Sequence, residues 1–257
     1  MMGRAFLRRG YSLFAVSHLS QPKATIPEIY DDVTRAVQHI REHAGEYGVD
    51  PGPKLGVVGA SAGGHLSLMV ATRGKETPGK QDGLVRAVAI FFPVTDVLKP
   101  GNPAKTEKDG GPSKRFRKLF GIDPDDLDAW NRVGRELSPL HHVDADTPPV
   151  LIIHGDDDEG VSFQQSEWYI EAAEKHGATA KLIRKRGKGQ AGQPSFGTSG
   201  SSQSGSTNTS SRPPPINLRP VWPRRNLQRA RLCGTQPGRV FARFPRFGPN
   251  RGVCQWH

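Results

Sequence analysis

The stretch Leu55-Gly56-Val57-Val58-Gly59-Ala60-Ser61-Ala62-Gly63-Gly64-His65-Leu66 decides the fold of this chain. A short valine-rich run ends in the pattern G-x-S-x-G, and an alanine- and leucine-rich segment follows from Leu66 to Ala71. This order predicts a strand, a sharp turn and a helix, with the serine exposed on the turn at the helix N-terminus. Ser61 is then a candidate nucleophile, and the Ala62 backbone N–H is a candidate donor to an oxyanion. An ordinary glycine-rich turn between strand and helix is the alternative interpretation.

The composition divides the chain into two parts. Its 257 residues suffice for one α/β domain with a hydrophobic core. The net charge of +11 is uneven, because no Asp or Glu follows Glu174 while arginines continue to Arg251. Both cysteines, Cys233 and Cys254, lie in this C-terminal part, so the rest offers no disulfide framework, thiol nucleophile or cysteine metal site. No apolar run approaches the length of a membrane span.

Strands and helices are expected to alternate along the chain. Apolar residues recur at helical spacing from Ile29 to Ala44, which predicts an amphipathic helix. The other expected elements are strands at 11–16, 55–60, 85–92, 150–153 and 180–184 and a helix from about 162 to 176. The alternation predicts a mostly parallel sheet covered by helices.

Residues 99–137 form a polar, irregular stretch with few hydrophobic residues, which we interpret as an insertion over the site, or a lid. It contains the basic cluster Lys114-Arg115-Phe116-Arg117-Lys118. Such a cluster is compatible with nucleic-acid binding, but a solvated helix face with Phe116, Leu119 and Phe120 underneath is the favoured interpretation.

Four motifs in order carry a resemblance: the G-x-S-x-G at 59–63, Ser138-Pro139-Leu140, Pro148-Pro149 before an apolar strand, and His154-Gly155-x-x-Asp158-x-x-Val161 followed by Gln165-Ser166. Together they resemble the α/β-hydrolase superfamily. Within it they are similar to the esterase/lipase group that includes acetyl and feruloyl esterases, close to prolyl-oligopeptidase-type hydrolases. The resemblance covers about residues 2–189 and implies an incomplete α/β-hydrolase domain over 1–189.

The resemblance implies that Asp158 is the acid that orients a catalytic histidine, with Ser61 as nucleophile and Ala62 in the oxyanion hole. The acids from Asp156 to Glu159 also suggest a cation cluster, but they are consecutive rather than alternate as in a calcium loop. No metal and no organic cofactor is expected.

Two parts of the family pattern are absent from this sequence. The H-G-G-type oxyanion loop would precede Leu55, and its absence leads us to expect that the start is internal to a longer gene. The general base would lie at Gln190, in Gly187-Lys188-Gly189-Gln190, but an amide cannot accept the serine proton at neutral pH. Restoring one base in a codon set for residues 190–194 yields His-Gly-Trp-Pro-Thr, so a frameshift at codon 190 is our hypothesis.

The rest of the chain, 190–257, is a basic tail rich in Ser, Gly, Pro and Arg, which we expect to be disordered or a frameshift product. The opposite view is that Gln190 and the tail are genuine. Five other histidines could replace the base, but a structural role is more typical of each: His18, His65, His141, His142 and His154.

Four functions remain open at this point. The first is a serine hydrolase that cleaves carboxylic esters through an acyl-enzyme, with a small-molecule or polysaccharide ester as substrate. A serine peptidase of prolyl-oligopeptidase type, a non-catalytic relative, and a nucleic-acid-binding protein acting through the tail are the alternatives. The expected compartment is the cytoplasm for this sequence, or the periplasm or exterior if a signal precedes it.

Overall fold

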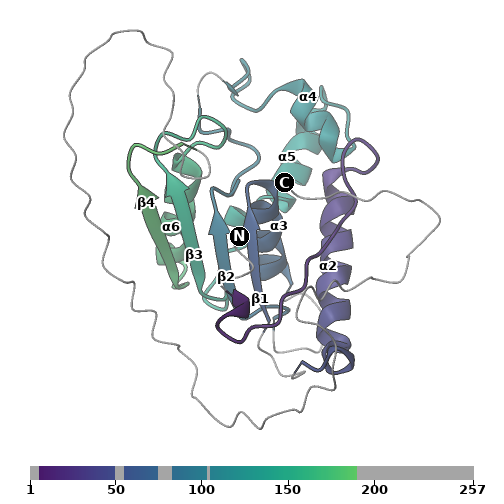
Figure 1. The fold of residues 1–257 in the computed structure, drawn as a ribbon. Coiled ribbons are helices and arrows are strands. Elements are labelled where there is room, and N and C mark those ends of the chain that lie inside the picture. Colours follow the sequence, from purple (N-terminus) through teal and green to yellow (C-terminus); the bar gives the residue numbers. More distant parts are fainter. Residues whose placement is uncertain (1–5, 50–54, 75–82, 103–104, 190–257) are drawn as a thin grey trace, which may run out of the picture. The chain divides into compact units, whose positions relative to one another are not determined.

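A computed structural model describes residues 6–49, 55–74, 83–102 and 105–189. Its centre is a four-stranded parallel sheet in the order β1-β2-β3-β4 (Figure 1). The strands are β1 (Gly56–Ala60), β2 (Ala87–Phe91), β3 (Val150–Gly155) and β4 (Ala180–Lys185). The expected parallel α/β sheet is therefore confirmed. The tail from Gln190 onward lies outside the described residues.

Helices connect the strands, as parallel neighbours require. The longer helices are α2 (Ile26–Glu42), α3 (Ala62–Arg73), α5 (Leu127–Glu136) and α6 (Gln164–Lys175). The short ones are α4 (Lys114–Arg117) and the 3-10 turns η1 (Ala44–Tyr47), η3 (Lys118–Phe120) and η4 (Pro139–His142). α2 begins at a capping box, in which the Thr25 hydroxyl and the Glu28 carboxylate satisfy each other's backbone N–H groups.

The main core lies between the sheet and the helices α3 and α6. Alternate strand residues point into it, so Ile90 and Ile152 are fully buried against Leu68 of α3 and Tyr169 of α6. The other strand positions are less enclosed, and Val58 of β1 is 36% exposed. No helix in the part of the chain that the structure describes is both long and apolar enough to span a bilayer.

Two expectations for the chain need correction. Residues 11–16 do not form a strand: β1 is the outermost strand of the described sheet, and this segment does not pair with it. In the basic cluster, Lys114, Arg115 and Lys118 are exposed as expected, but Arg117 is buried. Its guanidinium contacts the Asp109 carboxylate at 2.6 Å.

The 99–137 stretch has a hydrophobic core of its own. Phe120 and Trp130 pack edge to face, with ring centroids 5.1 Å apart, in a cluster that reaches Met69 of α3. The sparse hydrophobic residues of this stretch are therefore concentrated at the contact with the sheet domain. Whether the stretch acts as a lid stays a prediction.

Candidate active site

Ser61 lies on a strained turn between β1 and α3. Its φ of +52° falls in a region that side-chain-bearing residues rarely adopt, and its ψ is −121°. The Ser61 N–H donates to the Phe91 carbonyl at 3.0 Å, which anchors the turn to the carboxyl end of β2. This is the backbone geometry of a nucleophile elbow, in which strain holds the hydroxyl clear of the sheet.

The glycine before the elbow is required by close packing. A Cβ on Gly59 would lie 2.2 Å from the Gly63 carbonyl oxygen, so no larger residue fits between β1 and the first turn of α3. Ala62 is the first residue of α3, and its N–H is one of the four that have no acceptor within the helix. The oxyanion role expected of Ala62 stays a prediction.

Asp158 lies in the loop after β3, with its side chain fully enclosed. Its Oδ1 accepts hydrogen bonds from Gly160 N at 2.8 Å and Val161 N at 2.9 Å, which fix the carboxylate orientation. Its Oδ2 is buried and has no hydrogen-bond partner among the described residues. A buried carboxylate oxygen costs free energy unless a donor satisfies it, so this atom requires a donor.

His154 lies near that oxygen, but both of its ring nitrogens form hydrogen bonds with other groups. Its Nε2 lies 3.1 Å from the Val161 carbonyl and its Nδ1 lies 2.7 Å from Ser166 Oγ. A carbonyl only accepts, so Nε2 carries the proton and Nδ1 accepts from the hydroxyl. The 3.5 Å contact between Nε2 and Asp158 Oδ2 is not a hydrogen bond, since the proton is directed at Val161. Burial lowers the His154 pKa, which favours this neutral ring.

The other histidines of the described core are also held by structural contacts. His65 Nδ1 lies 3.1 Å from the Val94 carbonyl, and burial lowers its pKa to about 4. His142 Nε2 lies 2.8 Å from the Glu136 carbonyl, and His141 Nε2 lies 3.8 Å from Asp96. None of these rings, nor that of His154, makes a hydrogen bond to the Ser61 hydroxyl. The contacts favour the structural interpretation of these histidines.

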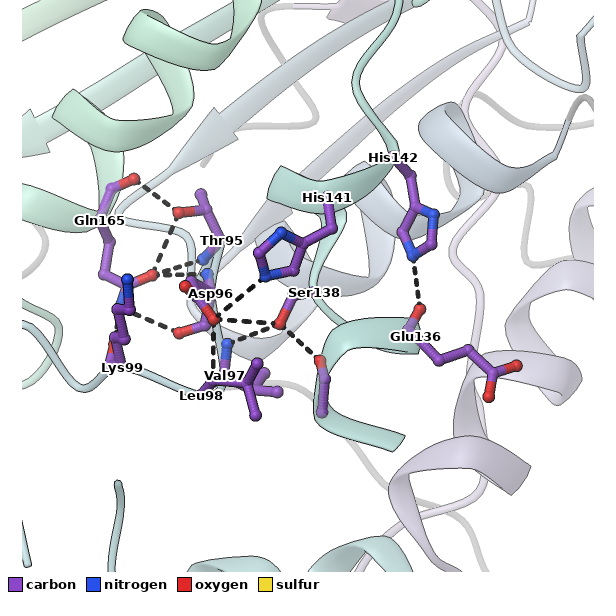
Figure 2. Close-up of polar contacts among 11 residues, drawn as sticks. Thr95, Asp96, Val97, Leu98, Lys99, Glu136, Ser138, His141, His142 and Gln165 are labelled. Carbon is purple, nitrogen blue, oxygen red and sulfur yellow. Dashed lines mark hydrogen bonds and ion pairs between the residues drawn. The ribbon is translucent and has the colours of Figure 1, made fainter. Parts of the chain in front are cut away.

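A buried polar network supports the loops around the site (Figure 2). The side-chain oxygen Oε1 of Gln165 accepts from Thr95 N and Asp96 N, both at 2.8 Å, and its side-chain Nε2 donates to the backbone carbonyls of Asp96 and Lys99. Ser138 Oγ accepts from Val97 N at 2.9 Å. The network therefore joins α6 to the loop after β2 and to Ser138, which directly follows the 99–137 stretch.

Gln165 and Ser138 belong to motifs in the sequence, but the sequence alone predicts no role for them. Their partners lie about 40 to 70 residues away, which no local pattern can show. The one signal in the sequence is the pair Gln165-Ser166 at the start of an amphipathic helix, because a polar residue that faces inward there needs a buried hydrogen-bond partner.

The expected base position, Gln190, lies outside the described residues. The preceding residues run alongside the acid loop: the Asp157 N–H donates to the Lys188 carbonyl at 3.1 Å. A Cβ on Gly155 would lie 2.1 Å from that same oxygen. Lys188, two residues before position 190, therefore contacts the loop that carries Asp158. The described residues contain no cluster of three or more metal-ligating side chains.

A parallel sheet, a serine on a strained turn after one strand and a buried acid after another are the features of an α/β-hydrolase fold. The chain belongs to the BD-FAE family, whose model matches residues 1–172. The probable carboxylic ester hydrolase LipM of Mycobacterium tuberculosis is 30% identical over 63% of this chain and 37% of its own length. A probable isoprenylcysteine alpha-carbonyl methylesterase of rice, Oryza sativa subsp. japonica, is 25% identical over 73% and 46%.

Solved esterase structures show the same fold. A truncated carbohydrate esterase from gut microbiota is 28% identical with a TM-score of 0.56, covering 68% of this chain and 65% of that one. Esterase 2 of Thermogutta terrifontis is 28% identical with a TM-score of 0.51, covering 67% and 58%. The chain spans less than half the length of the curated relatives named above.

Proposed function

We propose that this chain forms the core of a carboxylic ester hydrolase that works through an acyl-enzyme, with Ser61 as nucleophile and Asp158 as the acid. The observation that carries the proposal is the buried Oδ2 of Asp158, which has no hydrogen bond among the described residues and lies at the same end of the sheet as the strained Ser61 turn. That oxygen is suited to accept the Nδ1 proton of a histidine. The esterase names of the relatives support the same reaction class.

The reaction would follow the serine hydrolase scheme. Ser61 Oγ attacks the ester carbonyl carbon while a histidine takes its proton, and the Ala62 N–H stabilises the oxyanion. The carbonyl re-forms, the alcohol leaves with that proton, and water then attacks the acyl-enzyme by the same steps. Asp158 orients the histidine and stabilises the imidazolium.

The base is proposed to belong at position 190, because the chain reaches Gly189 alongside the Asp158 loop. Glutamine cannot carry out this proton transfer, so the chain with Gln190 would retain only binding and oxyanion stabilisation. Loss of a triad member costs several orders of magnitude in kcat, about 10⁴ to 10⁶ in serine proteases.

Histidine replacement tests the assignment. Gln190→His is expected to raise hydrolysis of 4-nitrophenyl acetate by at least about 100-fold, the contribution of a positioned general base. The rise should vanish in Gln190→His combined with Ser61→Ala or with Asp158→Asn. Gln193→His, the same exchange three residues later, serves as the matched control. Equal rates for both histidine variants would refute the assignment of the base.

A fluorophosphonate probe separates an active serine from a non-catalytic relative. We expect covalent labelling of the Gln190→His chain that is lost in Ser61→Ala, measured by mass spectrometry of the intact protein. Rates with acetyl and longer acyl esters against a prolyl peptide amide then distinguish esterase from peptidase. Labelling that persists after Ser61→Ala would assign the nucleophile to another residue.

A further inference from the structure

We propose that Asp156 is a positioning residue that fixes where the chain leaves β4, and so holds residues 187–189 against the loop that carries Asp158. The inference rests on the ester hydrolase function proposed above. Asp156 has no part in that reaction scheme. With this role, each of the three consecutive acids Asp156, Asp157 and Asp158 makes a different contact.

The Asp156 carboxylate joins β4 to the loop beyond it. Its Oδ1 accepts from the Gly187 N–H at 2.7 Å, and its Oδ2 accepts from Arg184 Nε at 2.8 Å. The Arg184 guanidinium lies 5.0 Å from the ring centroid of Phe163, so its own position is also restrained. One carboxylate therefore holds two points on either side of the end of β4.

Side-chain bonds are needed there because the sheet ladder stops short of the loop. The last paired residues of β3 and β4 are Gly155 and Lys185. Gly187 lies beyond them, in a left-handed conformation with a φ of +60°. The ladder thus ends before residues 187–189, and the Asp156 to Gly187 hydrogen bond is the first contact that sets the direction of the chain beyond it.

The backbone of the acid loop completes the attachment. The Asp157 N–H donates to the Lys188 carbonyl at 3.1 Å, and this oxygen approaches so closely that Gly155 cannot carry a Cβ. Asp156 thus acts with its carboxylate, Asp157 with its backbone and Asp158 with its buried oxygen. The run of acids that suggested a cation cluster is better explained by these three contacts.

Asparagine is the sharpest replacement for Asp156. The carboxylate accepts with both oxygens, but an amide of the same shape has one acceptor oxygen and turns an NH₂ group toward the other donor. Asp156→Asn should therefore release either Gly187 or Arg184 without creating a cavity. Glu159→Gln is the matched control, since it removes one negative charge from an exposed position of the same loop.

Hydrogen exchange of the full-length chain tests the attachment without any need for activity. In Asp156→Asn the Gly187 amide should exchange about tenfold faster, as expected when one backbone hydrogen bond of ordinary strength is lost. Arg184→Gln, which leaves Asp156 in place, should accelerate the same amide less, and Glu159→Gln should leave it unchanged. Unchanged exchange at Gly187 in Asp156→Asn would overturn the proposal.

The positioning role is tested in the Gln190→His chain. Its proton NMR spectrum should contain the far-downfield resonance of a histidine N–H bonded to a carboxylate. This resonance should disappear in Asp158→Asn. It should broaden or shift in Asp156→Asn but not in Glu159→Gln. Where the chain hydrolyses ester, Asp156→Asn should lower kcat about tenfold or more with KM unchanged. The resonance without hydrolysis would contradict the proposed function alone. If Asp156→Asn changes neither the resonance nor kcat, the positioning role is contradicted.

Discussion

Gln165 uses every hydrogen-bonding group of its amide inside the protein. Two backbone N–H groups donate to its oxygen and two backbone carbonyls accept from its nitrogen, with the side chain 2% exposed. A fully satisfied buried amide stabilises one loop arrangement, because any shift leaves several polar groups unpaired. This residue therefore fixes the loop that follows β2.

Gln165→Leu is predicted to lower the free energy of unfolding by at least about 3 kcal/mol, because it leaves several buried backbone groups unpaired at roughly 1 to 3 kcal/mol each. The midpoint of urea denaturation measures the loss. Gln164→Leu is the matched control, because this neighbouring glutamine is exposed. Similar midpoints for the two variants would contradict the role assigned to Gln165.

Single residues with a motif could be predicted from the sequence. Ser61 and Asp158 lie where the motifs suggested, one on a strained turn and the other enclosed after a strand. Arg117 could not be predicted, since its three basic neighbours in the cluster are all exposed and its pairing with Asp109 depends on tertiary contacts. The contacts of Asp156 with Arg184 and Gly187 were hidden for the same reason.

At the scale of elements, the strands were predictable and the 99–137 stretch was not. β2 and β3 are apolar runs buried in the sheet, and their sequences predict them directly. The 99–137 stretch is held by a few anchors, above all Arg117, which donates to the Pro112 carbonyl and lies 5.8 Å from the Trp130 ring. The wrong strand at 11–16 shows the limit of local pattern, because a strand also needs a neighbour.

Arg117→Met is predicted to destabilise this stretch by about 2 to 3 kcal/mol, because breaking a buried ion pair leaves its partners unsatisfied. The Asp109 carboxylate is one third exposed, so water will limit the loss. Arg115→Met, an exposed neighbour in the same cluster, should change stability by less than about 0.5 kcal/mol. Thermal unfolding measures both, and a large effect of Arg115→Met would contradict the structure of the cluster.

At the scale of the whole molecule, His65 is expected to make stability depend on pH. Burial lowers its pKa to about 4. An unfolded histidine titrates near about 6.5, so the unfolded state binds more protons between these values. The contribution is fully present above pH 6.5 and is lost as the pH falls towards 4, about 3 kcal/mol in total. Burial also lowers the pKa of His141, which adds in the same direction.

Urea denaturation at pH 7 and pH 5 checks this prediction, above the range in which carboxylates titrate. His65→Asn keeps a donor for the Val94 carbonyl but does not titrate, so its stability should differ less between the two pH values. His176→Asn, at an exposed histidine after α6, should keep the dependence of the unaltered chain. An unchanged dependence in His65→Asn would assign the effect to other groups.

The two outermost strands of the sheet differ in charge. β4 carries exposed Lys181 and Lys185 along its free side, and such charges discourage another chain from adding a strand. β1 reads Gly-Val-Val-Gly-Ala without a charge, and in the described sheet it pairs only with β2. Among the described strands β1 thus has the edge more open to strand addition, and Val58→Lys is expected to lower any self-association through this edge, measured by analytical ultracentrifugation.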